Sequence, residues 1–295
     1  MKKYTLYLLF VLAILSCDDA AISFSNEIDP FAGEELTLLS YQVTQSSGDV
    51  EFHSLQDNLE REVLLNDVRK NEFIYDQSRL TSIIQYNTDQ TIDESRTYNY
   101  DTNGNVLSID EIGVYTALSG NDMYNREVSL NANILRYQIP QSFFLGEVFR
   151  IELTLNSDGL IEQLNQSNSQ TGSTEAIYDF IYDSNDNCTR VDITRVSGGN
   201  VIQNSYNYIY DNARNPLYTH IRANYIPFVL KYGQAKLSGD DISTVIKNFG
   251  KNNILRTDTE YYQYTYNNNN YAATVTMRQT GTNEILSSTV FNYQQ

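Results

Sequence analysis

The clearest copy of the pattern that decides the fold is Tyr98-Asn99-Tyr100-Asp101-Thr102-Asn103-Gly104-Asn105-Val106. Alternation places Tyr98 and Tyr100 on one face of an extended strand. The Asp-x-Asn-Gly cluster that follows accepts positive φ angles and hydrogen-bonds to its own backbone, which reverses the chain. A second alternating segment then returns. The stretch therefore predicts a β-hairpin closed by a tight turn.

Degenerate copies of this hairpin recur along the chain. They share an aromatic or apolar residue followed by Asp or Asn, and they occur at Phe73–Leu80, Leu153–Leu160, Phe180–Asn187, Tyr208–Asn215 and Tyr264–Tyr271, with a fainter copy at Leu130–Ile134. The repeat length is about 27 residues. Nine or ten such hairpins give well over ten strands, and sheets of that size curl or close. We predict an all-β, large antiparallel meander, either a strongly curved sheet or an incomplete barrel.

Composition agrees with this fold, since the chain has 24 Tyr, 12 Phe, 4 Pro and no Trp. Aromatic and β-branched residues favour strands. One region, 216–253, breaks the rhythm and is interpreted as an irregular insertion. Within it we predict one short amphipathic helix near 239–248 that covers an open end or edge of the sheet, from a possible N-cap at Ser238, acidic Asp240 and Asp241, a terminating Gly250, and apolar Ile242, Val245, Ile246 and Phe249.

The N-terminus carries an export signal. Lys2 and Lys3 precede an apolar run from Tyr4 to Leu15 that is too short to span a bilayer. The run ends in Ile-Leu-Ser-Cys, which resembles the lipobox of bacterial lipoproteins. That resemblance implies a signal peptide at 1–16, lipidation of Cys17, a tether at 17–35 and a single repeat-built β domain at 36–295. Cys188 is then left without a partner for an intramolecular disulfide, and we interpret it as a small packed residue.

Charge excludes one class of partner. The chain holds 37 Asp and Glu against 20 Lys and Arg, a net charge of −17, and removal of Lys2 and Lys3 makes the mature chain more acidic still. Such a chain repels phosphate backbones, so we expect no nucleic-acid partner. It offers no basic patch to anionic headgroups either. Membrane attachment is therefore expected to rest on the N-terminal lipid.

A longer match extends the resemblance. The Tyr-Asp-x-x-Gly/Asn pattern is similar to the YD repeat of Rhs and teneurin shells. The chain resembles more strongly a group of Bacteroidota lipoproteins of unknown function with a porin-like β fold. In that group a Tyr-Asp turn is followed by Asn-Pro, a long insertion and an Asn-Asn pair. Here Tyr210-Asp211, Asn215-Pro216 and Asn252-Asn253 follow that order. The chain departs from true YD repeats, because only Gly104 and Gly159 hold the turn glycine.

Two turns imitate the start of a calcium loop. They are Asp101-x-Asn103-x-Asn105 and Asp183-x-Asn185-x-Asn187. The sixth and twelfth positions lack the Gly and Glu of such a loop, and hairpin turns need the same residue types for backbone reasons. We interpret both as structural turns and predict no metal and no cofactor.

Catalytic motifs are absent from the sequence. His53 and His220 are the only histidines, and no nucleophile elbow, zinc-protease motif or phosphate-binding loop appears. Each histidine is interpreted as an ordinary surface or packed residue. The remaining candidates for ligand contact are two tyrosine ladders, Tyr206, Tyr208 and Tyr210 and then Tyr262, Tyr264 and Tyr266. The alternative for both ladders is a purely structural role across neighbouring strands.

Three functional hypotheses follow. The first is a non-catalytic lipoprotein scaffold of the cell envelope, lipid-anchored at the outer membrane on its periplasmic or cell-surface side, with a structural role or a glycan or peptide ligand. The second is a secreted hydrolase that uses two carboxylates. The third is a transmembrane β-barrel, which would need an outward apolar band that the Asn-, Thr- and Asp-rich strands interrupt.

Overall fold

The structure is a computed structural model that describes residues 35–113, 123–140, 148–197, 199–232 and 242–294. It shows nineteen strands in one antiparallel sheet. Their bounds are Leu38–Gln45 (β1), Val50–Gln56 (β2), Leu59–Leu65 (β3), Val68–Asp76 (β4), Arg79–Tyr86 (β5), Ile92–Tyr100 (β6), Val106–Ile112 (β7), Met123–Asn131 (β8), Ile134–Pro140 (β9), Val148–Leu155 (β10), Ile161–Asn168 (β11), Thr174–Tyr182 (β12), Cys188–Ser197 (β13), Asn200–Asn207 (β14), Ile209–Arg214 (β15), Asn252–Arg256 (β16), Glu260–Tyr266 (β17), Ala272–Gln279 (β18) and Ile285–Tyr293 (β19).

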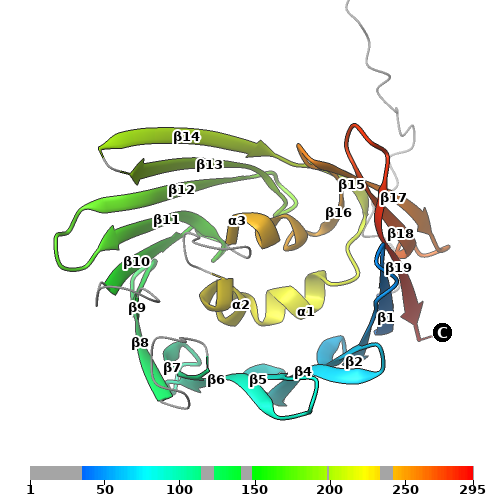
Figure 1. The fold of residues 1–295 in the computed structure, drawn as a ribbon, viewed down its shortest axis with the longest axis horizontal. Helices are drawn as coiled ribbons and strands as arrows, with labels where there is room; N and C mark the ends of the chain where they lie inside the picture. The colour runs from blue at the N-terminus through cyan, green and yellow to red at the C-terminus, as the bar shows by residue number, and fades with distance from the viewer. Residues whose placement is uncertain (1–34, 114–122, 141–147, 198, 233–241, 295) are drawn as a thin grey trace, which may run out of the picture.

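The sheet curls into a nearly closed barrel with one seam (Figure 1). Strands pair in chain order from β1 to β14 and again from β15 to β19, and β19 pairs with β1. Between β14 and β15 the described residues form no ladder; the chain continues through Tyr208 from a strand paired with β13 to one paired with β16. The predicted antiparallel meander and incomplete barrel are confirmed.

The repeated turns share one hydrogen-bond network. In the turn after β6, Asp101 Oδ1 accepts the N–H groups of Asn103 and Asn105, both at 2.8 Å. Asp183 holds Asn185 and Asn187 in the same way at 2.8 and 3.0 Å. Asn156 and Asn267 repeat the arrangement with their amide oxygens. The acid or amide of the motif therefore closes the turn, and the fourth turn residue takes a positive φ, as at Gly104 (86°).

Tyrosines of the motif connect neighbouring hairpins. A register shift lies beside each motif turn, and such a bulge frees backbone groups from the ladder. A tyrosine on a strand further along the chain donates its hydroxyl to one of those carbonyls. Tyr182 bonds to Ile161 O at 2.8 Å, Tyr210 to Cys188 O at 2.9 Å, and Tyr293 to Ala272 O at 2.6 Å, while Tyr100 bonds to Leu80 O.

Four helical segments lie inside the curve of the sheet (Figure 1). They are Tyr218–Ala223 (α1), Tyr225–Tyr232 (α2), Ile242–Val245 (α3) and the 3-10 turn Ile246–Asn248 (η1). Alternating residues of β10 to β13 face inward and join the helices in one buried apolar cluster that includes Ile151, Leu153, Leu164, Tyr178, Val191, Val229, Leu230, Ile242 and Ile246. The interior is therefore a packed core.

The predicted helix near 239–248 is present from Ile242, and its apolar residues pack as expected, with Ile242 and Ile246 fully buried. Ser238, Asp240 and Asp241 lie outside the described residues. The helix lies inside the barrel instead of covering an end or edge. The sequence analysis missed α1 and α2, because it interpreted the rest of the 216–253 insertion as irregular. Pro227 lies in the first turn of α2, where its missing N–H costs nothing.

The copy at 208–215 was also misassigned. Its Asp211 does not close a turn, because residues 209–214 continue as β15 into the insertion. The carboxylate instead binds the returning chain. Asp211 Oδ1 accepts the N–H groups of Ala213 and Asn253, both at 3.0 Å, and Tyr266 donates its hydroxyl to Oδ2.

Candidate ligand site

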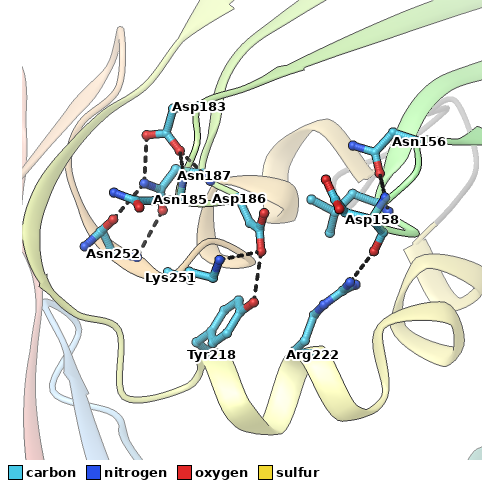
Figure 2. A network of polar contacts seen from close by, with 11 residues as sticks. Asn156, Asp158, Asp183, Asn185, Asp186, Asn187, Tyr218, Arg222, Lys251 and Asn252 are labelled. Atoms are coloured by element: carbon cyan, nitrogen blue, oxygen red, sulfur yellow. Dashed lines mark hydrogen bonds and ion pairs between the residues drawn. The ribbon is translucent and has the colours of Figure 1, made fainter. Parts of the chain in front are cut away.

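The insertion is anchored where it leaves and re-enters the wall. Asn215 Nδ2 donates to Asn248 O and Gly250 O at 3.0 and 2.9 Å. Asn252 donates its backbone N–H to Asn187 Oδ1 at 3.0 Å and accepts from Asn187 Nδ2 at 2.9 Å (Figure 2). The Asn-Asn pair, which lies about forty residues after the Tyr-Asp and Asn-Pro elements in the sequence, therefore meets both of them at one place. We call this group, Asp211, Asn215, Asn252 and Asn253, the clasp.

Further contacts hold α1 against the wall turns. Asp186 Oδ2 accepts from Tyr218 Oη and from Lys251 Nζ, each at 3.0 Å, and Arg222 donates to the Asp158 carbonyl (Figure 2). Deeper in, the bulged backbone N–H groups of Glu60, Leu80 and Ile161 donate to the side chains of His220, Asn224 and Tyr225 at 3.3, 2.8 and 2.9 Å. The helices are thus bonded to successive hairpins around the wall.

A cavity of about 220 Å³ lies between the insertion and the wall strands β1 and β16 to β19. Its wall side is largely aromatic and apolar, formed by Tyr41, Val43, Ile254, Tyr262, Tyr264, Val275, Thr289 and Phe291. Its insertion side is formed by Asn215, Pro216, Leu217, Lys247 and Asn248, with Asn252 and Asn253 at the clasp. An apolar wall facing a few polar groups is typical of a site for a small amphipathic ligand.

The second tyrosine ladder lines this cavity in part. Tyr262 and Tyr264 contribute to its lining, whereas Tyr266 stacks on Tyr264 at a centroid distance of 5.9 Å and bonds to Asp211. Tyr262 Oη donates to Glu260 Oε2 at 2.6 Å, and Lys247 Nζ lies 2.7 Å from the same oxygen. Burial raises the pKa of Tyr262 and of Tyr264, so both phenols stay neutral at neutral pH.

The first ladder is divided between two strands. Tyr206 lies exposed on β14, Tyr208 is buried and donates to Ser243 O at 2.8 Å, and Tyr210 bonds to Cys188 O and Lys247 O. Two of its three members therefore connect the wall to the insertion. The structure does not bring the three together at a common cavity.

Both histidines meet at one carboxylate beside the cavity. His53 Nδ1 lies 2.6 Å from Glu60 Oε1, and His220 Nε2 lies 3.8 Å from Glu60 Oε2. Tyr41, which lines the cavity, donates to Glu60 at 3.0 Å and stacks on His53 with ring centroids 4.0 Å apart. Sequence reasoning missed this convergence, because 160 residues separate Glu60 from His220 and no motif connects them.

The electrostatics of this cluster follow from burial and pairing. Burial would lower the pKa of His53, but hydrogen bonds and charge from Glu51 and Glu60 outweigh it and raise that pKa. Burial lowers the pKa of His220. The pairing with His53, whose Nε2 lies 3.6 Å from Glu51 Oε2, contributes most to a Glu51 pKa of about 2. The pKa of Glu60 is also lowered despite burial, because His53 bonds to it. The cluster is a set of paired charges with lowered carboxylate pKa values.

The calcium-like residues lie at turns whose oxygens already accept hydrogen bonds. Asp101 Oδ2 accepts Asn105 Nδ2 at 3.0 Å, in addition to the two N–H groups on Oδ1. Asp183 Oδ2 accepts Asn187 Nδ2 at 2.9 Å. A cation would have to displace these donors. In the described part of the chain, no three His, Cys, Asp or Glu side chains are grouped so as to hold a metal ion.

The two cysteines differ in what the structure says of them. Cys188 is fully buried, and burial raises the pKa of its thiol to about 12, so it is protonated and unreactive at neutral pH. Cys17 lies outside the described residues, and its lipidation stays a prediction. Among the helices of the described residues, none has the length and apolar composition to cross a membrane.

The chain is similar to known proteins in structure. No family model and no curated protein matches the sequence. A porin-like protein from Bacteroides uniformis is 10% identical with a TM-score of 0.45, and one from Bacteroides vulgatus is 11% identical with a TM-score of 0.40. Each match covers 88% of this chain and 99% of the other. The Photorhabdus luminescens Tc holotoxin pore is 10% identical with a TM-score of 0.27, over 81% of this chain and 11% of that one.

Proposed function

We propose that the chain is a lipid-anchored, non-catalytic scaffold of the cell envelope that binds a glycan or peptide group in the cavity beside Tyr262 and Tyr264. One observation carries the ligand proposal: a tyrosine ladder and an anchored insertion enclose a cavity with an aromatic wall and a polar wall. Its volume of about 220 Å³ lies below the usual range of drug-sized ligand sites. The cavity therefore suits a single sugar ring or peptide side chain.

The non-catalytic part of the proposal rests on the titratable groups. A carboxylate pair acting as acid and base needs one member with a raised pKa. Burial raises the pKa of Asp211, but its oxygens already accept from Tyr266, Asn253 and Ala213. Glu51 and Glu60 have lowered values. These pairings favour a structural role over general acid catalysis.

The outer face of the barrel wall carries many polar side chains, which favours contact with water over contact with lipid. Charged and polar side chains form cross-strand pairs on successive strands: Asn99–Asp110, Asn125–Asp110, Arg136–Glu152, Gln163–Asp179, Ser205–Asp192 and Arg278–Gln263. A membrane-spanning barrel presents an apolar band about 25 Å tall at this position. The pairs therefore favour attachment through Cys17 over insertion of the strands. A chain with Cys17→Ser is expected to remain soluble without detergent, whereas a detergent requirement would favour the transmembrane alternative.

Lipidation and location are tested together. Metabolic labelling with a fatty acid is expected to mark the wild-type chain and not Cys17→Ser. Proteinase treatment of intact cells then distinguishes the two faces of the outer membrane, with a periplasmic protein as the protection control. Absence of label from the wild-type chain would refute the anchor.

The cavity is tested with soluble peptidoglycan fragments, which present both sugar and peptide groups. Because the chain has no Trp, its intrinsic fluorescence comes from its 24 tyrosines, which include those of the ladder. Titration is expected to change this fluorescence, and Tyr264→Ala should weaken binding about tenfold. Tyr206→Ala is the matched control and should bind as the wild type does. Equal binding by all three chains would place the ligand elsewhere.

A further inference from the structure

Strand β14 has one free edge. It pairs with β13 in an unbroken register from Arg190 opposite Asn207 to Ser197 opposite Asn200. No described residue forms a ladder with its other edge. Tyr208 N donates to Thr189 O at 2.9 Å, which sets the even-numbered residues as those that bond toward β13. The backbone groups of the intervening residues, Val201, Gln203, Ser205 and Asn207, therefore point to the free edge.

The side chains leave this edge uncovered. All eight residues of β14 are exposed, including Val201 at 62% and Ile202 at 50%. Free edges are normally protected by lysine, proline or a bulge. The sequence Asn-Val-Ile-Gln-Asn-Ser-Tyr-Asn contains no charge and no proline, and its register with β13 has no shift. The edge therefore keeps the features of a strand that pairs with another.

We propose that two copies of this chain associate through β14, antiparallel across a two-fold axis. The register that uses all four outward-facing residues sets Val201 opposite Asn207 of the second copy and Gln203 opposite Ser205. On the inner face it places Ile202 beside Tyr206 of the second copy, an aliphatic–aromatic cross-strand pair. The arrangement is self-complementary, so one strand supplies both halves of the contact.

Charge selects where two copies can meet. The chain carries a net charge of −17, and close approach of two copies is opposed wherever acidic side chains face each other. An uncharged eight-residue strand avoids that repulsion along its own length. A strand pair alone buries less surface than a standard stable interface, so the dimer is expected to be reversible and dependent on concentration.

Cross-linking tests the register. In it, Asn204 lies opposite Asn204 of the second copy in a non-hydrogen-bonded pair, whose Cα separation of about 4.5 Å suits a disulfide. In the full chain carrying Cys17→Ser, Asn204→Cys should form a disulfide-linked dimer under mild oxidation. Asn200→Cys, on the same face but away from the axis, should remain monomeric on a non-reducing gel. Equal cross-linking of the two variants, or none of either, would overturn the register.

Sedimentation velocity over a concentration series tests the edge itself. Gln203→Pro removes an N–H that points away from β13, so the strand keeps its intramolecular ladder. It should raise the dissociation constant at least about tenfold, whereas Gln203→Thr, which keeps the N–H, should dimerise like the wild type. A wild-type chain that stays monomeric at every concentration would overturn the proposal, as would Gln203→Pro dimerising unchanged. If Gln203→Pro fails to fold, the Asn204→Cys result decides.

Discussion

The wall from β10 to β13 and the strand β14 that follows it differ in what their inner faces contact. The four wall strands alternate apolar residues that pack on the interior helices, and at the turn end of this wall the backbone N–H of Ile161 donates to Tyr225 of α2. Strand β14 has eight residues, as β10 and β11 do, yet all of them are exposed. Pairing with the wall alone therefore does not create a core; the insertion that fills the barrel does.

The largest effect on stability should come from breaking the buried ion pair between Glu111 of β7 and Arg126 of β8, which lies against α2 in the packed interior. Arg126 and Glu111 are both nearly inaccessible, and Arg126 Nε donates to Glu111 at 3.0 Å while another nitrogen donates to Leu230 O at 2.9 Å. Arg126→Met removes the two-nitrogen partner of a buried carboxylate, while Arg96 Nε stays 3.3 Å from Glu111 Oε1. The change should lower the free energy of unfolding by about 3 kcal/mol in urea titrations, the low end of the range for a broken buried ion pair. The double variant with Glu111→Leu should recover most of the loss. A double variant as unstable as Arg126→Met would contradict this.

The clasp should give the next largest effect. Asp211→Ala leaves the buried N–H of Asn253 without its acceptor and should cost about 2–3 kcal/mol. Asp179→Ala is the matched control, because Asp179 lies on the outer wall, where its carboxylate accepts from Gln163 Nε2 at 2.7 Å. The control should stay within about 0.5 kcal/mol of wild type by thermal or chemical denaturation. Equal losses would show that the insertion is not held by the clasp.

Removal of a tyrosine hydroxyl should destabilise the packed wall and leave β14 unaffected. Tyr182→Phe removes the bond to Ile161 O and should cost about 1 kcal/mol. Tyr206→Phe on the exposed strand should be neutral within about 0.5 kcal/mol. Denaturation of the two variants side by side measures the difference. Neutral behaviour of both would remove the inter-hairpin role assigned to the motif tyrosine.

Stability should depend on pH through the histidine cluster. The pKa of His53 is raised from 6.5 in the folded chain, so its contribution is fully present below pH 6.5 and is lost as pH rises through the folded value. His53→Gln should therefore reduce the melting temperature most at pH 6.5 and below, and progressively less at higher pH. His220, whose pKa is lowered, has the opposite sign and serves as the comparison. A deficit independent of pH would indicate packing alone.

Calcium should have no effect on thermal stability. The oxygens of Asp101 and Asp183 already close their turns. Calcium titration followed by thermal melting is expected to leave the melting temperature unchanged. A rise that Asp101→Asn abolishes would show that the turn binds the ion.

The sequence predicted what depends on local patterns. Alternation and turn chemistry located the hairpins, including the faint copy at Leu130–Ile134, whose turn joins β8 to β9. The pattern failed at Asp211, because a turn-forming acid and a clasp-forming acid have the same neighbours in sequence. The helices α1 and α2 were missed because they have only six and eight residues, too few turns to show a clear helical period.

The candidate site was predicted less completely than the fold. Tyr262 and Tyr264 were identified from the ladder, and the structure places them at a cavity. The same spacing at Tyr206, Tyr208 and Tyr210 did not form a site, because the chain passes there from one strand pairing to another. The meeting of His53, Glu60 and His220 depends on the long return of the insertion into the barrel, which no local pattern encodes.

Amide hydrogen exchange tests the contrast between the packed wall and β14 most directly. In dilute solution, where the chain is monomeric, the N–H groups of Leu80 and Ile161 should exchange slowly, because the interior helices accept them. The N–H groups of Val201, Gln203 and Ser205 should exchange fast, while that of Asn204, which bonds toward β13, should be slower. Fast exchange at Leu80 and Ile161, or uniform protection along β14 in the monomer, would contradict this structural account.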